Sequence, residues 1–185
     1  MAMGNEVAGV VLAYPARFKE HDGEVLVTFR DIDHALTSGG GEADALEQAR
    51  DCLAEAVAGL LAEGEPIPAP SRPRRGERLV PLDPVVAAKA MLSDAMRVRN
   101  VTQTELARRL DIGTRAVHRL LDPHHASRMD VLIRALSRVG VLAAFTVVTS
   151  AENRRLLHSG SAAPERRVLF RPMKAQHGRP AKAAG

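Results

Sequence analysis

The residues of this 185-residue chain that are best suited to chemistry lie between Val101 and Leu121, in the sequence VTQTELARRLDIGTRAVHRLL. Hydroxyl and amide side chains stand at the expected starts of two helices, where backbone N–H groups bind phosphate. Arginine and histidine follow in the second helix, in reach of base edges in the DNA major groove. We expect Arg115 to read a guanine and His118 to contact a base or a phosphate. The predicted DNA-binding residues are Thr102, Gln103, Thr104, Thr114, Arg115, His118 and Arg119.

Apolar residues in the same stretch have the spacing that packs two helices at a steep angle. The first helix is expected to end near Leu110, a turn to occupy residues 111–113, and the second helix to run from Thr114 to Leu121. The apolar positions are Leu106, Ala107, Leu110, Ile112, Val117 and Leu120. This pattern predicts a helix-turn-helix whose second helix enters the major groove.

Helix-start signals extend this unit to an all-α domain over residues 84–140. Asp83 and Pro84 predict an N-cap and a first-turn proline for the first helix. Thr102–Glu105 predicts a capping box, and Ser127–Asp130 predicts a similar start for the last helix. The alternative is a helical packing module whose arginines are merely solvated.

The charges of the chain are segregated along its length. Residues 1–70 carry 4 basic and 13 acidic side chains, whereas residues 84–140 carry 10 basic and 5 acidic ones. Residues 141–185 carry 8 basic and 2 acidic side chains. Two modules with different partners explain this division better than one enzyme core does, and the net charge of +5 over residues 84–140 favours DNA as the partner of the helical module.

The N-terminal module, over residues 7–70, is expected to be α+β. Alternating apolar residues predict strands at 10–18 and 25–29, with a short third strand near 35–37 before the glycines at 39–41. Apolar residues at steps of three and four from Glu42 then predict a helix that Gly64 ends, with Glu47, Asp51 and Glu55 on its solvent side. Residues 71–83 are expected to form a proline- and arginine-rich linker with a candidate fourth strand at 78–80. A candidate terminal strand at 141–150 and a basic, disordered tail at 151–185 complete the chain.

Other chemistries have weaker support. The single Cys52 excludes a disulfide framework and indicates a reducing compartment, and no apolar run is long enough to span a membrane, so we expect a cytoplasmic protein. The His124-His125 pair lacks further ligands at metal-binding spacing. The acidic residues Asp22, Asp31, Asp33 and Glu42 would need to converge to form a nuclease site. We therefore predict no catalytic residues, no metal and no cofactor.

Several segments together resemble the HicB antitoxin family, over about Val11 to Gly140. They are YPARF at 14–18, DGEVLVTFRDI at 22–32, DALEQARDCLAEAV at 44–57 and GEPIPAPS at 64–71. The chain departs from the family pattern at Arg30, where proline is usual, and at the glycines 39–41.

The resemblance implies a fold, a function and partners. It implies a degraded RNase H-like βββαβ domain followed by a helix-turn-helix domain, here similar to the XRE/Cro type. It also implies an antitoxin that neutralises a HicA-type mRNA-cleaving toxin, represses its own operon by binding operator DNA, and forms a homodimer or higher oligomer. Because an RNA-handling toxin should be basic, Asp31 and Asp33 are the candidate toxin contacts on the acidic module.

Two other functions remain open from the sequence. One is a stand-alone helix-turn-helix regulator whose N-terminal module senses a ligand or oligomerises. The other is an active metal-dependent nuclease, which would lose RNA cleavage when Asp31 or Asp33 is replaced.

Overall fold

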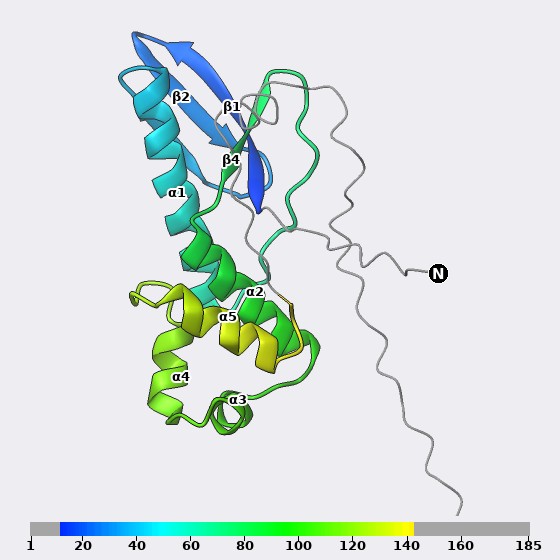
Figure 1. The fold of residues 1–185 in the computed structure, drawn as a ribbon. Coiled ribbons are helices and arrows are strands. Elements are labelled where there is room, and N and C mark those ends of the chain that lie inside the picture. Colours follow the sequence, from blue (N-terminus) through cyan, green and yellow to red (C-terminus); the bar gives the residue numbers. More distant parts are fainter. Residues whose placement is uncertain (1–11, 143–185) are drawn as a thin grey trace, which may run out of the picture.

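The computed structural model describes residues 12–142, which form an antiparallel sheet with one long helix, followed by four shorter helices (Figure 1). The strands are β1 Ala13–His21, β2 Glu24–Phe29, β3 Leu36–Gly39 and β4 Glu77–Pro81. The helices are α1 Glu42–Glu63, α2 Pro84–Val98, α3 Gln103–Leu110, α4 Thr114–Leu121 and α5 Met129–Arg138. The predicted α+β class and the order of three strands, a helix and a fourth strand are confirmed.

The sheet has the strand order β3-β2-β1-β4, and each neighbouring pair is antiparallel. Asp22 and Gly23 both have positive φ in the turn between β1 and β2, which Asp-Gly chemistry permits. Alternate residues of the strands face α1, as the period of two requires, and they lose all or nearly all solvent contact. This buried set includes Tyr14, Ala16, Val27, Phe29 and Val80.

The helix α1 lies close against the sheet at its N-terminal end. A side chain on Gly39 would place its Cβ 2.4 Å from the backbone nitrogen of Ala45, so β3 and α1 can meet only where no side chain intervenes. The third strand lies at Leu36–Gly39, later than the predicted 35–37, and it includes Gly39. As predicted, Gly64 ends α1 in the left-handed conformation.

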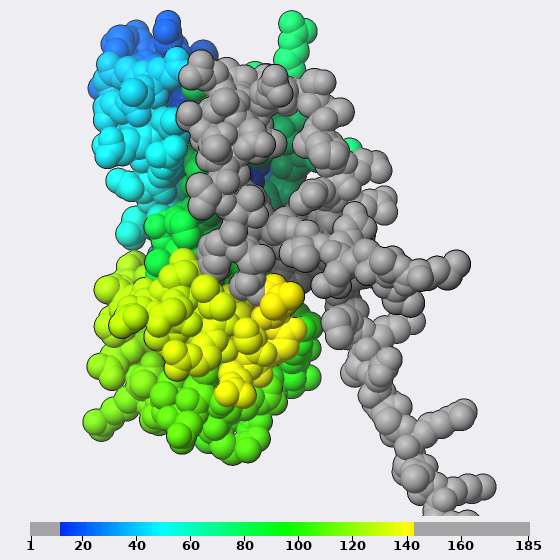
Figure 2. Space-filling model, viewed as in Figure 1, coloured from blue at the N-terminus to red at the C-terminus, as the bar shows by residue number. Residues whose placement is uncertain are grey.

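The helical part of the chain lies below the sheet and α1 in Figure 2. Its helices α2 to α5 enclose a second buried cluster. The start of α2 is as predicted, because the Asp83 carboxylate accepts the N–H groups of Val85 and Val86 at 2.9 and 3.0 Å. The helix α2 also contributes Ala90, Val86 and Ala87 to the first cluster. It is thus shared by the two parts of the molecule.

Three local predictions for the helical part need correction. Ser127 does not cap α5, which begins at Met129 with Arg128 at its N-cap and no side-chain cap; Asp130 pairs with Arg128 instead. Ile112 is 38% exposed and does not pack between the two helices. Thr102 accepts the Glu105 N–H, but the Glu105 carboxylate binds arginines, so only half of the capping box forms.

The remaining predictions on architecture concern other parts of the chain. The candidate strand at 141–150 extends past Leu142, and it and the tail at 151–185 lie outside the described residues. None of the helices between residues 12 and 142 is long and apolar enough to cross a bilayer.

Candidate functional site

The helices α3 and α4 form the pair of short helices that the sequence predicts. They are joined by residues 111–113, where Asp111 adopts a left-handed conformation and its N–H caps the end of α3. Leu106, Val117 and Leu120 are buried between these helices and their neighbours. All seven side chains predicted to bind DNA are exposed: Thr102, Gln103, Thr104, Thr114, Arg115, His118 and Arg119.

The arginines of α3 are engaged within the protein. The Glu105 carboxylate accepts hydrogen bonds from Arg108 at 2.9 Å and from Arg109 at 2.7 Å. These bonds lower the pKa of Glu105 to about 2, so it is ionised throughout the neutral range. Arg109 also donates to the Arg138 carbonyl at 3.2 Å, which links α3 to the end of α5.

The arginines of α4 differ from those of α3. Within residues 12–142, the side chains of Arg115 and Arg119 make no hydrogen bond or ion pair. Arg119 also lines a hollow of about 250 Å³ beside the start of α5, together with Ser127 and Arg128. The exposed face of α4 therefore presents guanidinium groups that are available to an anionic partner.

The C-terminal end of α4 is held by a residue that sequence reasoning missed. Lys89 of α2 is fully buried, and its Nζ donates to the carbonyl of Asp122 at 2.6 Å and to that of His125. Burial lowers the pKa of Lys89, while the nearby Asp122 carboxylate opposes this shift. The available signal was a lysine placed one turn before Leu92, on the apolar side of α2.

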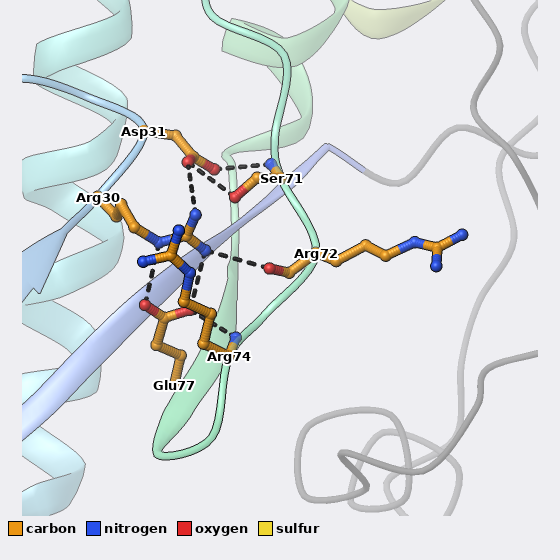
Figure 3. A network of polar contacts seen from close by, with 6 residues as sticks. All are labelled: Arg30, Asp31, Ser71, Arg72, Arg74 and Glu77. Atoms are coloured by element: carbon orange, nitrogen blue, oxygen red, sulfur yellow. Dashed lines mark hydrogen bonds and ion pairs between the residues drawn. The ribbon is translucent and has the colours of Figure 1, made fainter.

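A second polar network fastens the segment between α1 and β4 to the sheet (Figure 3). Arg30 donates to both carboxylate oxygens of Glu77, at 3.1 and 3.0 Å, and to the carbonyl of Arg72 at 3.1 Å. The Arg74 N–H donates to Glu77 at 2.7 Å. Arg30 thus acts as a clamp, because it joins the end of β2 to the start of β4.

Asp31 belongs to the same network. Its two carboxylate oxygens accept hydrogen bonds from the backbone and the hydroxyl of Ser71, at 2.7 and 2.8 Å. Its side chain is only 10% exposed, whereas Asp33 is exposed. Tyr14 adds a third anchor, since its hydroxyl donates to the Pro68 carbonyl at 2.8 Å. The segment expected to be a linker is therefore fastened to the sheet at several points.

Apart from Asp31, the acidic residues between positions 12 and 70 are exposed. Glu47, Asp51 and Glu55 are exposed along α1, as the sequence predicts. Asp22 and Glu42 are exposed as well, but residues 12–142 contain no group of three or more His, Cys, Asp and Glu side chains that could hold a metal ion. The described geometry provides an acidic surface and gives no support to a nuclease centre.

Comparisons with known proteins identify the family of this chain. A family model described as the HicB-like antitoxin of bacterial toxin–antitoxin systems matches residues 13–91, from β1 into α2. The antitoxin HicB of Escherichia coli (strain K12) is 34% identical over 119 residues, covering 64% of this chain and 86% of that protein. The chain belongs to the HicB-like antitoxin family.

Further members of the HicB-like family show the same extent of similarity. Antitoxin HicB 2 of Photorhabdus laumondii is 31% identical over 129 residues, which cover 70% of this chain and 91% of that protein. Antitoxin HicB 1 of the same organism is 32% identical over 130 residues, which cover 70% of this chain and 83% of that protein. Because the 129 and 130 matched residues outnumber those up to the end of β4 at Pro81, the similarity extends beyond the sheet and α1.

Proposed function

We propose that this HicB-like chain is a two-part antitoxin. Its sheet and α1 bind and neutralise a small, basic, mRNA-cleaving toxin of the HicA type, and its helices α2 to α5 bind operator DNA and repress the chain's own operon. Family membership supports the antitoxin role. The N-terminal module, proposed to have a degraded RNase H-like fold, acts by covering the toxin's RNA-binding surface.

The DNA-binding part of this proposal rests on one observation. In a helical region rich in arginine, the α3 arginines are paired with Glu105, whereas Arg115 and Arg119 on α4 are exposed without a partner among the described residues. This arrangement suits a helix-turn-helix in which α4 is the recognition helix. Thr102, Gln103, Thr104 and Thr114 at the two helix starts would then contact phosphates.

The acidic surface supports the toxin-binding part. Exposed acidic side chains on α1 and at Asp33 would attract a basic protein and exclude RNA from the same surface. Asp31 is proposed to act mainly within the protein, because Ser71 already binds both of its oxygens. Asp33 is the more accessible of the two predicted contacts.

Binding of the full-length chain to DNA from upstream of its own gene tests the operator-binding half. Fluorescence anisotropy with that duplex and with a shuffled duplex of equal length gives the sequence preference directly. We expect tighter binding to the upstream duplex and an affinity that falls with salt, because phosphate contacts release counterions. Equal affinity for the two duplexes would remove operator recognition from the proposal.

A further inference from the structure

Lys89 occupies a place in the core that a charged side chain rarely takes. Its side chain is fully buried, and its Nζ donates two hydrogen bonds, one at the end of α4 and one in the turn that follows. Asp122 is the C-cap of α4, and its carbonyl accepts a hydrogen bond from the Lys89 ammonium at 2.6 Å. The carbonyl of His125, in the turn that follows, is the second acceptor.

The chemistry of this contact suits a helix terminus. The last carbonyls of a helix lack partners within the helix and carry partial negative charge, which a cation stabilises. Burial of the ammonium costs free energy that these carbonyl contacts must offset. An apolar residue at position 89 would fill the core without this cost, but each carbonyl would keep only its weaker hydrogen bond. These are the bonds from the His125 N–H to Asp122 at 3.2 Å and from the Ser127 hydroxyl to His125 at 3.4 Å.

The helix that carries Lys89 is itself fixed on two sides. Ala88 and Leu92 pack in the cluster shared with α3, α4 and α5, whereas Ala90 packs in the cluster shared with the sheet and α1. The Asp83 carboxylate holds the start of α2 next to the end of β4. The hydrogen bond from Lys89 therefore fixes the end of α4 relative to α2, a helix that packs in both clusters.

We propose that Lys89 is a positioning residue for DNA recognition, which sets the direction of α4, and hence of Arg115 and His118, by tying the end of α4 to α2. This inference rests on the proposed operator binding. It assigns to a residue with no surface exposure a share in sequence discrimination. Base-edge contacts depend on helix direction more strongly than phosphate contacts do, because only the former require a defined approach to the groove.

The test compares three full-length variants for binding to the upstream and the shuffled duplex. Lys89→Met keeps the length of the side chain and removes its donors. Leu92→Ala is the matched control, because it weakens the same helix and the same cluster but keeps both hydrogen bonds from Lys89. Lys89→Gln restores amide N–H donors without the charge, and it replaces Lys89→Met in the comparison if the latter fails to fold. Circular dichroism fixes a temperature at which the compared variants are folded.

We expect Lys89→Met to lose about tenfold in preference for the upstream duplex, the equivalent of one base contact, with little change in affinity for the shuffled duplex. Lys89→Gln should lie between Lys89→Met and the parent chain, and Leu92→Ala should keep the parent's preference despite its lower thermal stability. An unchanged preference in the folded Lys89 variants, or an equal loss in Leu92→Ala, would overturn the inference. Failure of the parent chain to prefer the upstream duplex would instead contradict operator binding itself.

Discussion

Arg115 is the side chain that the proposed DNA contact depends on most. It is exposed on α4 and has no partner among residues 12–142. We expect Arg115→Ala to weaken binding to the upstream duplex by about 1 to 3 kcal/mol and to relax the sequence preference, because a bidentate contact to guanine is lost. Anisotropy titrations at fixed salt measure both effects.

Arg50→Ala is the control for that experiment. It removes the same side chain and charge from an exposed position on α1. The helix α1 is far from α3 and α4 in the sequence and packs against the sheet. It should leave DNA affinity within experimental error of the parent chain. Equal losses in the two variants would show that Arg115 acts only through net charge.

Tyr14 offers a direct measure of how firmly the segment before β4 is held. Burial, with the nearby Asp31 carboxylate, raises the pKa of Tyr14 from 10.0 to about 12. Because Tyr14 is the only tyrosine and the chain has no tryptophan, the near-ultraviolet absorbance of tyrosinate reports on this residue alone. The titration midpoint should lie near 12 in the folded chain and return to about 10 in urea.

The same shift has a consequence for stability. A raised pKa means that the folded state holds the Tyr14 proton more tightly than the unfolded state, so the stabilisation is complete below pH 10 and is lost as the pH rises towards 12. Tyr14→Phe should lack this alkaline loss, and it should cost about 1 kcal/mol at neutral pH through the missing bond to Pro68. Urea unfolding at several pH values measures both effects. If the parent chain and Tyr14→Phe lose the same free energy of unfolding at alkaline pH, Tyr14 is not the source of that loss.

The β3–α1 junction makes a prediction about two neighbouring glycines. A Cβ at Gly39 would meet the backbone of Ala45 and Asp44, whereas one at Gly41 meets nothing within 4 Å and its φ of 173° suits any residue. Gly39→Ala should therefore destabilise the fold by about 1 to 3 kcal/mol, because backbone must move to admit the methyl group. Gly41→Ala should change stability little. Thermal unfolding of the two variants distinguishes them. Similar melting temperatures would contradict the close contact between β3 and α1 at Gly39.

The segment from Glu65 to Gly76 should depend on Arg30. Arg30→Ala removes a guanidinium that binds the nearly buried Glu77 carboxylate and the Arg72 carbonyl. The segment should then open locally and become a better substrate for trypsin, which cleaves after arginine, at Arg74 and Arg75. Limited proteolysis followed by mass spectrometry identifies the cut sites. Cleavage there no faster than in Arg50→Ala would show that Arg30 does not clamp the segment.

The elements themselves follow from local sequence. Alternation of apolar residues in β1 and β2, Asp83-Pro84 at the start of α2, and Gly64 at the end of α1 act within a few residues, so sequence patterns predict them well. Ser127 shows the limit of such signals, because its spacing to Asp130 fits a capping box, but Asp130 pairs with Arg128 and the helix starts two residues later.

The contacts that fix the site are long-range, and sequence reasoning could not find them. Arg30 meets Glu77 and Asp31 meets Ser71 only because β1 lies between β2 and β4. Lys89 meets the end of α4 across 33 residues of chain. The exposure of Arg115 and His118, by contrast, followed from helix periodicity alone. Sequence thus predicts which side chains face outward better than it predicts what holds them.

For the molecule as a whole, the charge pattern and the fold divide the chain in the same way. The sheet and α1 carry an exposed acidic surface, and α4 presents arginines that have no partner among residues 12–142, with α2 packed into both clusters. In our account each part has its own partner, a basic toxin for the first and DNA for the second. A variant such as Arg115→Ala should therefore weaken operator binding and keep toxin binding.

Purification of the full-length, tagged chain from its native host tests the antitoxin role most directly. Mass spectrometry identifies what is retained, and an RNA-cleavage assay then shows whether the chain inhibits the protein found. We expect a small basic protein in roughly equal amount, whose RNA cleavage stops when the chain is added. A chain that retains no such protein while still binding DNA upstream of its own gene would contradict the account, and it would identify a stand-alone regulator instead.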